Sequence, residues 1–201
     1  MNILKNIIKV LAPFLKQLGF SKKGNNFYLE VDKNFGVVNF QKSRDSTQEV
    51  ALFTINFGIY ANVLGRFEYR SNGSDKPGVT ECQWQSRVGH FMPGSPDYWW
   101  KINISDNLSG ITNDISEIFK GIIMPELKRR LSDEGLIQCW LSDCYAGTTE
   151  VGRFKCLSTL LKIKGDFNTL DEVVETFMQQ SKGKPNAILG VEHLKDIGYI
   201  K

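Results

Sequence analysis

EVALFTINFGIYA, residues 49–61, is the strongest strand signal in the sequence. Its odd positions form a continuous apolar row: Ala51, Phe53, Ile55, Phe57 and Ile59. Its even positions include Thr54, Asn56, Gly58 and Tyr60. Because successive side chains of a strand point to opposite faces of a sheet, this stretch predicts a strand with one buried and one exposed side.

Four further stretches show the same alternation, two before this strand and two after it. They are residues 26–32, 36–43, 80–89 and 97–105. Asp32, Lys33 and Asn34 supply turn chemistry between the first two stretches. Three consecutive strands with short connections predict an antiparallel meander, and the two later stretches bring the sheet to about five strands.

Helical spacing marks the segments on either side of these strands. One apolar stripe opens the chain: Ile3, Ile7, Val10, Phe14 and Leu18. Pro13 should kink or restart that helix, and Gly19 should end it. A second stripe is formed by Ile111, Ile115, Ile118 and Ile122. It predicts a helix that continues to Leu131, bent by Pro125 and followed by Gly135.

Three more helices are expected toward the C-terminus. One covers roughly residues 150–162, and the next opens at a capping box formed by Thr169 and Glu172. The last helix lies between Pro185 at its start and Gly198 beyond its end. The pattern predicts an α+β protein: an antiparallel sheet of about five strands, one face covered by helices, then a helical extension. We place the α+β domain at residues 1–135 and the extension packed on it at residues 136–201.

The polar side of the predicted sheet is rich in carboxamides and poor in carboxylates. Such a side is either solvated or a binding surface. Amides offer donors and acceptors in fixed planes, and arginine suits an acidic or phosphorylated group. The candidate binding residues are Asn39, Gln41, Ser43, Arg44, Asn56, Gln83, Gln85, Arg87, Trp99 and Lys101.

Sequence patterns for catalysis and metal binding are weak. Cys82 with His90 could form a nucleophile–base pair, but Cys82 falls on the predicted core side, where a thiol is usually inert. Cys139 and Cys144 have the spacing C-x4-C without a second close pair. The glycines match neither nucleotide-binding fingerprint, and paired carboxylates are absent from the predicted polar side of the sheet. We therefore expect no catalytic residue, no cofactor and no metal.

Charge and cysteine content favour a cytoplasmic protein. Residues 1–105 carry 13 Lys and Arg against 8 Asp and Glu, a net charge of +5 within a total of +3. That bias permits an acidic partner but is too small for a dedicated nucleic-acid binder. The 4 cysteines are too few for a disulfide framework. Lys5, Lys9 and Lys16 interrupt the apolar N-terminal segment, so neither a signal peptide nor a membrane span is expected.

Five short blocks, in this order, resemble the DUF4304 family of bacterial proteins. The blocks are GFSKKGNNFY (19–28), VNFQKSR (38–44), FTINFGIY (53–60), CQWQSRVG (82–89) and WWKI (99–102). The resemblance covers roughly residues 1–130, and no established activity comes with the family. It implies that the family's characteristic blocks include Gln41, Lys42, Ser43, Arg44, Cys82 and Arg87.

Three functions remain open from the sequence. The first is binding to another protein through the polar side of the sheet, in an immunity or accessory role. The second is binding of single-stranded nucleic acid, with Tyr28, Tyr60 and Trp99 stacking on bases. The third is an enzyme of unknown reaction, for which Gln41, Ser43, Arg44 and Arg87 should converge in a concave pocket.

Overall fold

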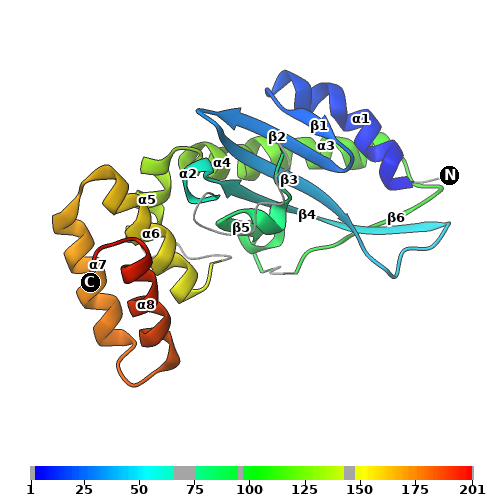
Figure 1. Cartoon of the computed structure of the whole chain (residues 1–201). Helices are drawn as coiled ribbons and strands as arrows, with labels where there is room; N and C mark the ends of the chain where they lie inside the picture. The colour runs from blue at the N-terminus through cyan, green and yellow to red at the C-terminus, as the bar shows by residue number, and fades with distance from the viewer. Residues whose placement is uncertain (1–2, 66–75, 95–96, 143–147, 201) are drawn as a thin grey trace. The chain divides into compact units, whose positions relative to one another are not determined.

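The computed structural model describes residues 3–65, 76–94, 97–142 and 148–200. The chain divides into two compact units, Met1–Ser132 and Asp133–Lys201. The first unit contains an antiparallel sheet with helices, and the described part of the second is helical (Figure 1). The predicted α+β class, with an antiparallel sheet and C-terminal helices, is confirmed.

Six strands form the sheet of the first unit, in the order β1-β2-β3-β4-β5, with β6 also paired to β4. They are β1 (Ser21–Lys23), β2 (Asn26–Val31), β3 (Asn34–Lys42), β4 (Val50–Tyr60), β5 (Trp84–Arg87) and β6 (Trp100–Asn103). All neighbours pair antiparallel, β6 with the start of β4 and β5 with its second half. β1 was not predicted, because its residues are polar and exposed and show no apolar alternation.

The turn between β2 and β3 has the chemistry that the sequence predicts. Val31 pairs with Asn34, so Asp32 and Lys33 form a two-residue hairpin loop. Both loop residues have positive φ, 49° and 71°. Type I′ turns require this conformation, and their twist matches that of the flanking strands.

The apolar face of the sheet is buried under helices, as the alternation predicts. The covering elements are α1 (Ile3–Gln17), α3 (Leu108–Ile118), the π-helical turn η3 (Phe119–Ile123) and α4 (Met124–Arg130) (Figure 1). Phe119 connects this layer to the sheet: its ring stacks on Phe40 of β3 and meets Phe14 of α1 edge-on. All of Phe27, Val38, Phe40, Ile55 and Phe57 are buried.

Three details of the covering helices differ from the sequence prediction. In α1 the buried stripe is Ile3, Ile7, Leu11 and Leu15, whereas Val10 is 53% exposed. Pro13 lies inside α1 without ending it. The helix after residue 108 contains the turn η3 directly before Pro125, whose missing N–H cannot donate to the preceding turn.

Arg130 lies in the core of the first unit. Arg130 ends the basic run of α4, yet its side chain is wholly buried. Its guanidinium carbon lies 4.2 Å from the centroid of the Trp84 ring. Its Nη1 donates to the Glu126 carboxylate at 2.5 Å and to the Glu126 carbonyl at 3.0 Å. A buried arginine is tolerated because its charge is paired and its plane is stacked.

The described part of the second unit is a set of helices: α5 (Asp133–Leu141), α6 (Glu150–Lys164), α7 (Phe167–Gln180) and α8 (Pro185–Asp196). Its core centres on Phe154 and Phe177, whose rings stack with centroids 3.8 Å apart. Leu194 and Ile197 of the α8 region complete the buried cluster. The helix expected to start at Pro185 is present, and Gly198 follows its end with a φ of 65°.

Two features of this unit differ from the sequence prediction. The preceding helix α4 ends with Leu131 as its C-cap, as predicted, but Gly135 beyond it lies inside α5, a helix that was not predicted. α7 begins at Phe167 with Asp166 as its N-cap, so the predicted capping box of Thr169 and Glu172 is wrong. The Asp166 carboxylate accepts a hydrogen bond from the Thr169 backbone N–H. Asp and Thr both have cap chemistry, and the sequence alone did not separate them.

The remaining short helical elements are α2 (Asn62–Gly65), η1 (Val79–Glu81) and η2 (Val88–Phe91), all in the first unit. Across the described residues, each helix is too short or too polar to cross a bilayer.

Candidate functional site

The face of the sheet opposite the helices has two different parts. The alternation predicted an exposed polar side throughout, and this is wrong for one part. Tyr28 and Val37 are buried there together with Cys82, and Phe35, Tyr60 and Val79 pack against them. The chain at η1 and just after it closes over this part of the sheet.

Gly58 permits that close approach. A Cβ atom at Gly58 would lie 2.6 Å from the carbonyl oxygen of Trp84 and 2.8 Å from the Cβ of Cys82. Cys82 therefore belongs to a second small core on the polar side, whereas the sequence placed it on the helix side. Burial raises the pKa of the Cys82 thiol, which keeps it protonated and a poor nucleophile.

The other part of this face carries a row of amides. Strand register places Asn26 opposite Asn39, Asn39 opposite Asn56, and Asn56 opposite Arg87. The row therefore crosses β2, β3, β4 and β5 on one face of the sheet. The Asn39 Nδ2 donates to Asn26 Oδ1 at 2.5 Å, and the Asn56 Nδ2 donates to Gln41 Oε1 at 2.6 Å.

Arg87 ends the row and joins it to a carboxylate. Its Nε donates to Asn56 Oδ1 at 3.3 Å, and its guanidinium carbon lies 5.1 Å from the Trp99 ring centroid. Its Nη1 forms an ion pair with the Asp97 carboxylate. The Trp99 Nε1 donates to the same Asp97 oxygen at 3.1 Å. Gln41, Asn56, Arg87, Asp97 and Trp99 thus form one connected hydrogen-bonded chain.

The electrostatics of this chain centre on Asp97. Hydrogen bonds from Arg87 and then from Trp99 hold the pKa of the Asp97 carboxyl below its ordinary value. Asp97 is therefore ionised at neutral pH and accepts charge-assisted hydrogen bonds. Because its side chain is 67% exposed, this ion pair contributes little to folding stability.

Four of the ten candidate residues belong to this network, namely Gln41, Asn56, Arg87 and Trp99, and a fifth, Asn39, lies beside it in the row and pairs with Asn26. The sequence missed Asn26 and Asp97. Asn26 could have been included, since it alternates in phase with Tyr28 at the start of β2. Asp97 could have been included too, since it opens the alternating stretch 97–105 in phase with Trp99, although β6 begins only at Trp100.

The other candidates lie at or beyond the margins of the network. Gln85 is half-buried opposite Gly58, and Lys101 is exposed on β6 opposite Leu52. Ser43 follows the end of β3, where its Oγ accepts the Asp45 backbone N–H at 3.1 Å. Arg44 is exposed in the same turn.

Gln83 lies away from the exposed face. It precedes β5, is buried, and accepts the Ala61 backbone N–H through its Oε1 at 2.8 Å. The sequence pattern extended the strand alternation back through residue 83, but β5 begins only at Trp84.

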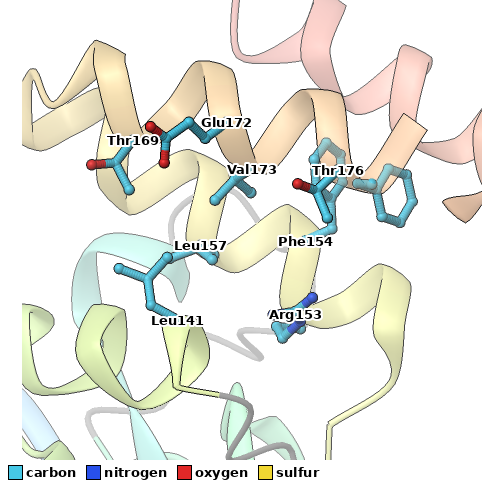
Figure 2. A pocket seen from close by; sticks show the side chains of 9 residues that line it. Leu141, Arg153, Phe154, Leu157, Thr169, Glu172, Val173 and Thr176 are labelled. Carbon is cyan, nitrogen blue, oxygen red and sulfur yellow. The ribbon is translucent and has the colours of Figure 1, made fainter. Parts of the chain in front are cut away.

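Pockets are found in both units, and neither of the two described below contains a candidate residue. The first, of about 210 Å³, lies between α6, α7 and the end of α5 (Figure 2). It is lined by Leu141, Arg153, Phe154, Leu157, Thr169, Glu172, Val173, Thr176 and Phe177. The second, of about 480 Å³, lies between the end of α1 and β1. Gln41, Ser43, Arg44 and Arg87 line neither pocket.

Metal ligands and nucleophiles are not gathered at the polar face. Among residues 3–65, 76–94, 97–142 and 148–200, no group of three His, Cys, Asp or Glu side chains could hold a metal ion. Cys144, half of the C-x4-C spacing, lies outside the described residues. The His90 Nδ1 lies 3.0 Å from the Ser86 Oγ, but Ser86 is buried on the helix side of β5.

Comparison with known proteins identifies the family of the first unit. The family model described as "Domain of unknown function (DUF4304)" matches residues 11–129. This is more than half of the chain, so the chain belongs to the DUF4304 family, as the five sequence blocks suggested. No curated protein and no solved structure matches the chain.

Proposed function

We propose that this member of the DUF4304 family binds another protein through the amide row and Arg87. The observation that carries the proposal is the connected hydrogen bonding from Gln41 through Asn56 to Arg87. Side chains that are already held in place lose little conformational entropy on binding. The face therefore offers preset donors and acceptors to a partner.

The composition of the face supports a protein partner. Arginine and tryptophan are enriched at protein interfaces and often carry much of their binding energy. Here Arg87 and Trp99 lie against each other at one end of the amide row. Lys101 and Arg44 add exposed positive charge on β6 and after β3.

Single-stranded nucleic acid is the weaker alternative, because the expected stacking surface is reduced. Tyr28 is buried in the second small core and offers no ring face to a base. Trp99 has one face against the Arg87 guanidinium. Nucleic-acid binding would fall steeply with salt concentration, and this separates the two functions.

We also propose that the interaction takes place in the cytoplasm of a bacterial cell, in an immunity or accessory role. The 4 cysteines of the chain are too few for a disulfide framework, and this supports a reducing compartment. Cell fractionation followed by immunoblotting tests the location.

Affinity capture from the source cells tests the proposed function. Tagged wild type, Arg87→Ala and Lys128→Ala are used as baits, and captured proteins are quantified by mass spectrometry. Lys128 is an exposed cation on α4 and so serves as a matched control away from the face.

We expect one protein to be captured equally by wild type and Lys128→Ala and to be reduced at least about tenfold by Arg87→Ala. Equal capture by all three baits would exclude the polar face as the binding surface. Capture of nucleic acid that disappears above physiological salt would favour the alternative function.

A further inference from the structure

The polar face already binds a carboxylate, that of its own Asp97. Arg87 and Trp99 both donate to this side chain, and the Arg87 guanidinium is oriented by Asn56 and by stacking on Trp99. Arginine and an indole N–H directed at one oxygen form a recognition site for an acidic group. The contact with Asp97 therefore shows that this site can bind a carboxylate.

Asp97 is the weakly held member of the contact. Its side chain is 67% exposed, whereas that of Arg87 is 28% exposed. Asp97 lies before β6 begins at Trp100, so no strand pairing fixes it. An ion pair with an exposed partner is weak, since water competes for the exposed charge. A carboxylate from outside could replace Asp97 without disturbing Arg87, which keeps its contacts with Asn56 and Trp99.

We propose that Asp97 stands in for an acidic side chain of the partner, and that the partner binds by displacing Asp97 from Arg87 and Trp99. This inference rests on the proposed function and adds the chemistry of the partner: an exposed Asp or Glu that reaches Arg87. The net charge of +5 on residues 1–105 favours an acidic surface in the partner.

Displacement has a measurable signature. When Asp97 occupies the site, an external carboxylate cannot bind there. The apparent affinity for the external ligand is therefore the intrinsic affinity multiplied by the fraction of molecules in which the site is open. Removing Asp97 should therefore raise the affinity for an acidic ligand, whereas removing Arg87 should abolish it. An exposed ion pair holds Asp97 in place only modestly, so the expected gain is about two- to sixfold.

Nuclear magnetic resonance tests this on the full chain. The ¹⁵N-labelled protein is titrated with hexaglutamate at constant ionic strength, and the Trp99 indole N–H resonance is followed. Hexaglutamine is the neutral control, and inorganic phosphate is a second anion. The variants are Asp97→Ala and Arg87→Gln, and Lys128→Ala controls for general cationic attraction.

We expect hexaglutamate to shift the Trp99 indole resonance saturably, with tighter binding in Asp97→Ala and none in Arg87→Gln. Hexaglutamine should leave the resonance unchanged. Equal affinity of wild type and Asp97→Ala would overturn the displacement, as would a response to phosphate without one to hexaglutamate. Capture that depends on Arg87 but is not strengthened by Asp97→Ala would leave the proposed function intact and contradict only this inference.

Discussion

Gly58 occupies the centre of β4, where the chain at η1 closes over the sheet. The space that a side chain would need is taken by the Trp84 carbonyl and by Cys82. We predict that Gly58→Ala lowers the free energy of unfolding by about 1–3 kcal/mol, because overpacking displaces backbone. Urea denaturation followed by circular dichroism measures the change.

Gly110→Ala is the matched control for this substitution. Gly110 lies in α3, and a Cβ there would meet nothing within 4 Å. Alanine should leave stability unchanged or raise it by up to about 1 kcal/mol, through helix propensity. A destabilisation of Gly58→Ala no greater than that of Gly110→Ala would contradict the close packing over β4.

His193 gives the second unit a pH dependence. The Nε2 of His193 lies 3.0 Å from the Ser158 Oγ, and desolvation by burial lowers its pKa from 6.5 to about 4. Lys155 lowers the pKa further, and Asp196 raises it. Between these pH values the unfolded chain binds a proton that the folded chain does not. The contribution of neutral His193 to the free energy of unfolding is therefore complete above pH 6.5 and is lost as the pH falls toward 4.

We predict that wild type loses about 2–3 kcal/mol more stability than His193→Gln between pH 7 and pH 4.5. Urea denaturation of the full chain at both pH values measures the difference, and other titrating groups cancel in the comparison. Identical losses in the two proteins would show that His193 titrates normally in the folded state.

At the scale of the secondary-structure elements, the contact between α4 and β5 depends on a buried ion pair. Arg130 stacks on Trp84 of β5 and pairs with Glu126 within α4. We predict that Arg130→Ala lowers the free energy of unfolding by about 3–5 kcal/mol, since it removes one partner of a buried pair. Arg129→Ala should cost less than about 0.5 kcal/mol, because Arg129 contacts the same carboxylate from an exposed position. Thermal and urea unfolding compare the two, and similar losses would mean that Arg130 is solvated.

Elements with strong periodicity could be predicted from the sequence, and elements governed by tertiary contacts could not. Apolar and polar residues alternate over many positions in β3 and β4, so the sequence alone predicts which side chains of these strands are buried. β1 has three polar residues and forms only because β2 supplies a partner strand. The cover over Tyr28 depends on a segment far along the chain that approaches Gly58, and no local pattern encodes that approach.

In the candidate site, too, local periodicity could be predicted from the sequence and tertiary contacts could not. Strand alternation placed Asn39, Asn56 and Arg87 on one face, and the register aligned them in one row. Gln83 was assigned to this face because the alternation was extended beyond the start of β5. Asp97 alternates in phase with Trp99, but it precedes β6, so its position beside Arg87 follows only from the tertiary structure.

At the scale of the whole molecule, the amide row lies within the family-matched part of the chain. The row and its hydrogen-bonded network lie between Asn26 and Trp99 in the sequence, and the match covers residues 11–129. The second unit, with its own core and the α6–α7 pocket, lies outside the match. We therefore place the proposed partner binding in the first unit.

The most direct test of that assignment is the nuclear magnetic resonance spectrum of the full chain with the captured partner added. The side-chain amides of Gln41 and Asn56 and the indole N–H of Trp99 report on the polar face itself. We expect these three resonances to shift or broaden, while signals from residues lining the α6–α7 pocket stay in place. Unchanged amide and indole resonances, with shifts confined to the second unit, would contradict the assignment.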